Sequence, residues 1–104
     1  MTVSPQPNTA DAPHWRQPVT IYVAGEQDLL TAPLLQARLR RVIDGQPAEE
    51  ITIDLSEVTF MDCAGLRPLL EAKALIGGRL RLLQVPPPVV RLFELTNTHA
   101  RLLG

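Results

Sequence analysis

The alternation of strand-like and helix-like patterns along this chain predicts an α/β fold built on a mostly parallel sheet. Apolar and polar side chains alternate over residues 19–25, as they do in a strand with one buried face. Apolar residues at helical spacing follow over residues 35–43, and the same order of strand and helix returns over residues 51–55 and 66–76. Strands joined by a helix lie parallel through right-handed crossovers, so we expect the helices to pack on the sheet.

The chain begins with a proline-rich stretch, residues 1–18, which we expect to be a flexible tail in front of a single domain over residues 19–104. Proline fixes a backbone dihedral and lacks a hydrogen-bond donor, so the prolines of this stretch disfavour regular structure. Residues 14–16 are a candidate for a short edge strand where the tail meets the domain. The first strand of the domain should then end at Gly25.

A helix is expected after a loop over residues 26–30. Thr31 is suited to be its N-cap, and Pro33 falls in the first turn, where its missing N–H costs little. Glycine and proline at positions 45 and 47 should end this helix. Its apolar face carries four side chains at helical spacing: Leu35, Leu39, Val42 and Ile43.

The second half of the chain repeats this order of elements. The strand over residues 51–55 leads to a helix over residues 66–76, which Gly77 and Gly78 should end. Pro68 falls in the first turns of that helix, where proline is tolerated.

The last part of the chain should hold one more strand and a short helix. The strand is expected over residues 79–85, and the three prolines at 86–88 then force a stiff corner. An amphipathic helical pattern follows over residues 89–96, and residues 100–103 can add a last turn.

Composition places the chain among ordinary globular proteins. With 104 residues, of which 45% are hydrophobic and 20% charged, it is large enough for one core. A net charge of −1 argues against a binder of nucleic acids or anionic membranes, since both need a basic patch. The single cysteine excludes an internal disulfide and suggests a reducing compartment. The lack of long apolar runs and of a signal-peptide pattern then predicts a cytoplasmic protein without membrane insertion.

The most informative stretch is residues 59–66, between the second strand and the second helix. Asp62 is a good N-cap, because its carboxylate can accept the free N–H groups of the first helical turn. The small residues Cys63, Ala64 and Gly65 let another surface approach the backbone. The free N–H groups and the helix dipole also favour an anion at this turn. On the residue pattern alone, these small residues serve either internal packing or a partner.

Residues 54–66, Asp-Leu-Ser-Glu-Val-Thr-Phe-Met-Asp-Cys-Ala-Gly-Leu, resemble the signature of STAS domains and, more narrowly, of the bacterial anti-sigma-factor antagonists. In those proteins the end of this stretch usually reads Asp-Ser-Ser-Gly-Leu or Asp-Ser-Ala-Gly-Leu. Residues 25–33 are similar to the family's Gly-Glu-Leu-Asp-Leu-Ala-Thr-Ala-Pro, and residues 77–80 and 89–96 extend the match. The resemblance implies a small mixed, mostly parallel sheet of about four strands, with helices packed mainly on one face.

The resemblance also implies a regulatory protein and not an enzyme. The helix tip and the loop that carries Asp28 would bind an anti-sigma factor, typically a kinase-like ATP-binding protein, and so release a sigma factor. No cofactor is expected, and neither a phosphate-binding glycine loop nor a metal-ligand cluster is present in the sequence. The alternative is a STAS accessory subunit of a larger assembly, such as a lipid-transport ATPase or a stress-signalling complex. A weak homodimer is also compatible with the resemblance.

One position departs from the family pattern. In phosphorylated members the modified serine or threonine immediately precedes the glycine, and here that residue is Ala64, which has no hydroxyl. The binding role can carry over to this chain, but phosphorylation at this position cannot. Ser56 and Thr59 are the nearest alternative hydroxyls.

Two residues of the expected partner surface have competing interpretations. Asp28 is either a contact residue or a solvated loop carboxylate. Cys63, at a helix N-terminus, could be a reactive and redox-sensitive thiol, but we expect it to be buried and inert. Catalysis by this thiol would need an activating base, and the only two histidines lie at positions 14 and 99. The whole expected surface comprises five residues: Asp28, Asp62, Cys63, Ala64 and Gly65.

Overall fold

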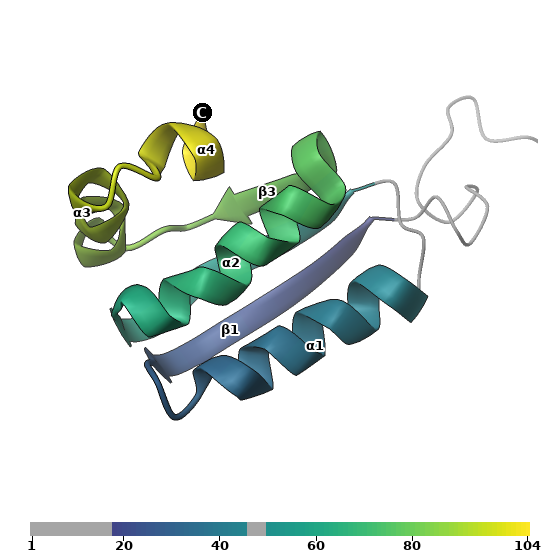
Figure 1. Ribbon diagram of the computed structural model, residues 1–104, viewed down its shortest axis with the longest axis horizontal. Coiled ribbons are helices and arrows are strands. Elements are labelled where there is room, and N and C mark those ends of the chain that lie inside the picture. Colours follow the sequence, from purple (N-terminus) through teal and green to yellow (C-terminus); the bar gives the residue numbers. More distant parts are fainter. Residues whose placement is uncertain (1–17, 46–49) are drawn as a thin grey trace, which may run out of the picture.

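The computed structural model describes residues 18–45 and 50–104, and within them three strands form one parallel sheet (Figure 1). The order of the strands in the sheet is β1 (Val19–Gln27), β2 (Ile51–Met61) and β3 (Leu80–Leu83). The predicted α/β class and the parallel pairing are therefore confirmed. The candidate edge strand at residues 14–16 and most of the expected tail lie outside the described residues.

Two long helices lie side by side on one face of this sheet (Figure 1). They are α1 (Ala32–Gly45) and α2 (Cys63–Ile76), and α2 contacts all three strands. α2 is followed by a 3₁₀ turn, η2 (Gly77–Arg79), so the two glycines end the helix as predicted. Two shorter helices follow β3: α3 (Pro87–Leu95), which packs on β2, and α4 (His99–Leu103), which contacts α2 and β3.

The core lies between the sheet and the helices. Burying one large apolar side chain stabilises a fold by roughly 1.5–3 kcal/mol, so a few such residues hold the helices on the sheet. Tyr22 points the other way from its neighbours Ile21 and Val23 and is 63% exposed. The largest fully buried side chains come from the central strand and two helices: Ile51, Ile53, Leu55, Leu69 and Phe93.

β1 and β2 both extend further than the sequence pattern predicted. β1 reaches Gln27 and β2 reaches Met61, whereas we expected ends at Gly25 and at residue 55. The pairing continues through Gly25↔Val58 to Gln27↔Met61, with two irregularities in register that interrupt the alternation of side chains. Gly25 has a φ of +81°, which a residue without Cβ adopts at little cost. The two strands therefore reach the start of α2 together.

Two further predictions were wrong in detail. β3 is shorter than the expected strand over residues 79–85, because Gln84 has a φ of +55° that ends the extended conformation. α2 begins at Cys63, three residues before the expected start at Leu66, and Pro68 lies buried in its second turn. Because proline has no N–H, α2 lacks the hydrogen bond that residue 68 would otherwise donate to the Ala64 carbonyl.

Candidate partner-binding site at the start of α2

The N-terminus of α2 is capped by Asp62, as predicted. Asp62 has extended backbone angles, with φ −117° and ψ −172°, and its Oδ1 accepts the N–H groups of Ala64 at 2.9 Å and Gly65 at 3.1 Å. An N-cap of this kind stabilises a helix by about 1 kcal/mol. The carboxylate therefore occupies donors that would otherwise be free for an anion.

Gly65 packs directly against the end of β1. A Cβ on this residue would lie 2.2 Å from the Gln27 carbonyl oxygen and 2.6 Å from the carbonyl carbon. The same carbonyl oxygen accepts the Asp62 N–H at 3.1 Å. Glycine at position 65 is therefore required by the close approach of two backbones, and this contact joins the start of α2 to the loop that follows β1.

The loop between β1 and α1 is folded around Asp28. Its Oδ1 accepts the N–H groups of Leu30 at 3.0 Å and Thr31 at 3.1 Å, and lies 3.3 Å from the Thr31 hydroxyl. The Thr31 hydroxyl also accepts the Asp28 N–H at 2.9 Å and donates to the Glu26 carbonyl at 2.9 Å. Thr31 immediately precedes α1, as expected, but its side chain ties the loop together. Asp28 is thus half-buried and hydrogen-bonded, and is not a freely solvated carboxylate.

The five expected site residues differ in exposure. Gly65 is buried, while Asp28, Asp62 and Ala64 are half-buried. Cys63 is exposed, so the prediction of a buried thiol is wrong. The reason is the phase of the helix, because Cys63 projects to the side of α2 opposite its buried residues, among them Leu69 and Ile76. Within the described residues, nothing hydrogen-bonds its thiol.

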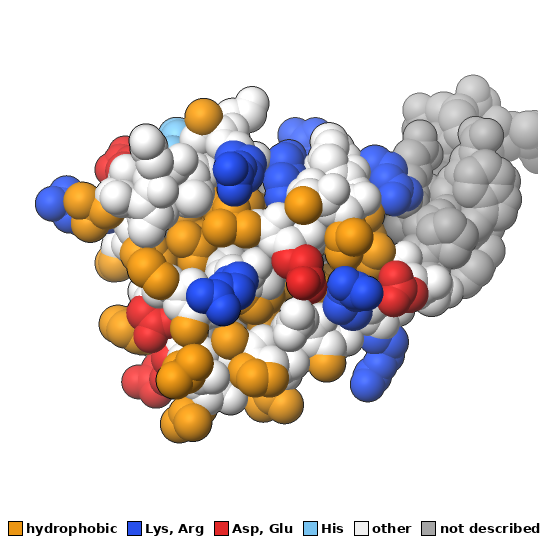
Figure 2. Space-filling model, viewed as in Figure 1, with side chains coloured by type: hydrophobic (Ala, Val, Ile, Leu, Met, Phe, Trp, Pro, Cys, Tyr) orange, Lys and Arg blue, Asp and Glu red, His pale blue; other side chains and the backbone are white. Residues whose placement is uncertain are grey.

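Three exposed leucines, which the sequence pattern did not single out, lie in the Asp28 loop and the first turn of α1. Leu29, Leu30 and Leu34 are 75%, 84% and 70% exposed. Figure 2 shows hydrophobic side chains gathered at the end of the molecule where β1 leads into α1 and where α2 begins. Exposed apolar patches of this kind mark interaction sites. For Leu34 a sequence signal was available, because this residue falls outside the apolar spacing of Leu35 and Leu39 in α1.

A family model described as the Mlab, STAS domain matches residues 12–104. The chain belongs to the STAS family.

Its relatives within that family include regulators of sigma factors. An anti-sigma F factor antagonist from Paenibacillus polymyxa is 30% identical over 87 residues, which cover 81% of this chain and 74% of that protein. An anti-sigma-B factor antagonist from Listeria monocytogenes is 33% identical over 100 residues, which cover 93% of this chain and 83% of that protein. The anti-sigma factor antagonist SpoIIAA in its unphosphorylated form has the same fold. It superimposes with a TM-score of 0.64 at 22% identity, over 81% of this chain and 76% of that one.

A shallow groove leads from the tip of this STAS domain between α1 and α2. It has a volume of about 190 Å³, and Ala64 lies in its wall. Four apolar or small side chains line it near the tip: Leu29, Ala32, Pro33 and Pro68. Three polar side chains complete the lining: Gln36, Arg67 and Glu71.

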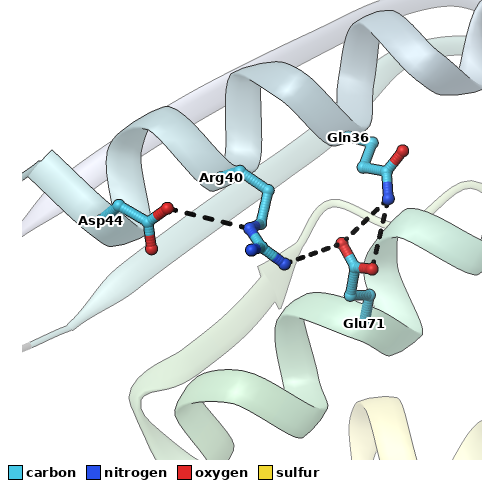
Figure 3. Close-up of polar contacts among 4 residues, drawn as sticks. All are labelled: Gln36, Arg40, Asp44 and Glu71. Atoms are coloured by element: carbon cyan, nitrogen blue, oxygen red, sulfur yellow. Dashed lines mark hydrogen bonds and ion pairs between the residues drawn. The ribbon is translucent and has the colours of Figure 1, made fainter.

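A polar cluster bridges the two helices of this groove (Figure 3). Gln36 Nε2 donates to both carboxylate oxygens of Glu71 at 3.2 Å, and an Arg40 guanidinium nitrogen lies 3.7 Å from Glu71 Oε1. Arg40 also lies 3.8 Å from Asp44, one turn along α1. Exposed pairs of this length contribute at most about 1 kcal/mol each, so the cluster orients the side chains more than it stabilises the fold.

Ser56 and Thr59, the hydroxyls nearest to the position of Ala64 in the sequence, lie on β2, and both are exposed. Ser56 is held by Asp54, whose Oδ1 accepts the Ser56 N–H at 2.9 Å. This backbone hydrogen bond, together with the Ser56 hydroxyl, lowers the pKa of the Asp54 carboxyl below its ordinary value. Thr59 follows in the same strand, close to the tip.

The described residues do not form a metal-binding site. Residues 18–45 and 50–104 contain no group of three histidine, cysteine or acidic side chains placed to bind one. Nor is any helix in those ranges long and apolar enough to span a bilayer.

Proposed function

We propose that this STAS domain is an anti-sigma-factor antagonist that binds an anti-sigma factor through the tip of α2 and the Asp28 loop. The observation that carries the proposal is the joining of these two segments into one surface. The Gln27 carbonyl contacts both Asp62 and Gly65, and the exposed Leu29 lines a groove together with Ala64. Relatives named anti-sigma factor antagonists, at 30% and 33% identity, support the general role.

The mechanism we propose is competition for the anti-sigma factor. The partner, a kinase-like ATP-binding protein, would lay an apolar patch against Leu29, Leu30 and Leu34 and place polar groups near Asp28 and Asp62. Binding at this surface would displace the sigma factor from its inhibitor. The proposed role is regulatory and cytoplasmic, involves no catalysis, and needs neither nucleic acid nor membrane.

Control by phosphate at the tip is absent from this mechanism. Phosphate would add charge and bulk where the partner docks, and so block binding. Ala64 has no hydroxyl to accept it. The antagonist would therefore be unswitched at this position, or controlled through its synthesis, through the exposed Cys63 thiol, or at another residue.

The test is binding and displacement with purified proteins. The STAS domain is titrated into each ATP-binding anti-sigma protein of the source organism, and into each anti-sigma–sigma complex, and sigma release is followed by size-exclusion chromatography. An Ala64→Asp variant should bind at least tenfold more weakly, which corresponds to about 1.4 kcal/mol. Its matched control is Ala74→Asp, an exposed residue near the other end of α2, which should bind as the wild type does.

The same experiment separates the proposal from its alternative. Equal binding by wild type and Ala64→Asp would show that the interface lies elsewhere on the domain. Affinity purification from the source organism that recovers a transporter ATPase, and no anti-sigma protein, would instead favour an accessory subunit of a larger assembly.

A further inference from the structure

The wall of the groove between α1 and α2 carries a positively charged side chain, Arg67, whose charge no described residue neutralises. Arg67 lies in its wall and is exposed, and among residues 18–45 and 50–104 it has neither an ion pair nor a hydrogen bond through its side chain. The nearest acid on its own helix face, Glu71, is already engaged by Gln36 and Arg40. Arg67 therefore has its full donor capacity available to a carboxylate from another molecule.

The rest of the groove is suited to one apolar side chain. Its volume of about 190 Å³ lies below the roughly 300–1,000 Å³ of pockets that take small-molecule ligands. Leu29, Pro33 and Pro68 supply apolar walls.

We propose that this groove is a specificity site for the anti-sigma partner: it takes one large aliphatic side chain, while a neighbouring carboxylate of the partner pairs with Arg67. The inference rests on the proposed function and names the chemistry by which the partner is selected. Charge complementarity places the acid at Arg67, because the tip itself carries the acidic residues Glu26, Asp28 and Asp62, which would repel it. The groove adjoins the tip through Ala64, so one partner segment can reach both.

The experiment uses the full chain and the ATP-binding anti-sigma protein that binds it most tightly, with affinity measured by calorimetry at low and high salt. We expect Arg67→Glu to weaken binding at least tenfold and to reduce its dependence on salt. We expect Leu29→Ala to weaken binding three- to tenfold, without loss of fold because this side chain is 75% exposed. The matched control is Arg41→Glu, the same charge change at an exposed position towards the C-terminal end of α1.

A rescue variant tests the pairing itself. Replacing the partner's carboxylate by lysine should restore at least part of the binding of Arg67→Glu. Wild-type affinity in Arg67→Glu, or equal weakening by Arg41→Glu, would overturn the groove proposal while leaving the anti-sigma role in place. Failure of the wild-type chain to bind any ATP-binding anti-sigma protein would overturn the proposed function and this inference together.

Discussion

Replacing Gly65 by alanine tests whether the close approach of two backbones holds the site together. The new Cβ would lie 2.2 Å from the Gln27 carbonyl oxygen, 2.6 Å from its carbon and 2.8 Å from the Gln27 Cβ. An uncrowded carbon–oxygen contact is about 3.3 Å long. β1 and α2 must therefore separate by about 1 Å, because the crowded atoms belong to the backbone and cannot rotate away.

The size of the effect follows from three opposing contributions. Overpacking of this kind costs about 1–3 kcal/mol. Stretching the Asp62 N–H bond to the Gln27 carbonyl, now 3.1 Å, loses about 1 kcal/mol more. The better helix propensity of alanine returns at most about 1 kcal/mol. We expect a net loss of about 2 kcal/mol in the free energy of unfolding, which lowers Tm by roughly 8–16 °C in a domain of this size.

Thermal and urea unfolding followed by circular dichroism measure this loss. Gly78→Ala is the matched control, since Gly78 is exposed and a Cβ there would meet nothing within 4 Å. The control should change the free energy of unfolding by no more than about 0.5 kcal/mol. A Gly65→Ala variant as stable as the control would refute the argument that this contact requires glycine.

Three other expectations concern modification and titration. Incubation with a cognate kinase and ATP should add no phosphate to the tip, and intact-mass analysis that maps a stoichiometric phosphate to Ser56 or Thr59 would contradict an unswitched antagonist. Cys63, the single cysteine of the chain, should react with a thiol probe in the native state because it is exposed, and labelling only after unfolding would contradict the described helix phase. The pKa of Asp54 should lie below its ordinary value, as followed by the pH dependence of its carboxyl NMR shift. Because the folded pKa is the lower one, the stabilisation is present above the unfolded pKa and is lost as the pH falls through the folded pKa; a titration at or above the ordinary value would contradict it.

Local patterns in the sequence were sufficient for the type and order of the main elements and for the cap of α2. The breakers Gly45 and Gly77 placed the C-terminal ends of both long helices, and Asp62 caps α2 as its residue type predicts. The full length of the strands could not be predicted, because two register irregularities interrupt the alternation that identifies a strand.

The site was harder to predict, since its shape depends on contacts between distant segments. Nothing local to Asp28 and Asp62 indicates that the Gln27 carbonyl joins their segments. The exposed leucines were not singled out, because single apolar residues in a loop or beside a core position are common and carry no local signal of function. The exposure of Cys63 was accessible in principle from the helical phase of α2, but the substitution of cysteine for serine favoured burial as the simpler interpretation.

The hydrogen bonds within the Asp28 loop also bear on the thermodynamics of association. A loop whose aspartate already engages Leu30 and Thr31 has little conformational freedom left to lose when a partner arrives. Because the loop backbone is already folded, the heat-capacity change on binding should reflect the apolar area covered and little coupled folding. Antagonists with a loosely held loop would need more contact area to reach the same affinity. The folded loop allows this small domain to compete for its partner with a compact surface.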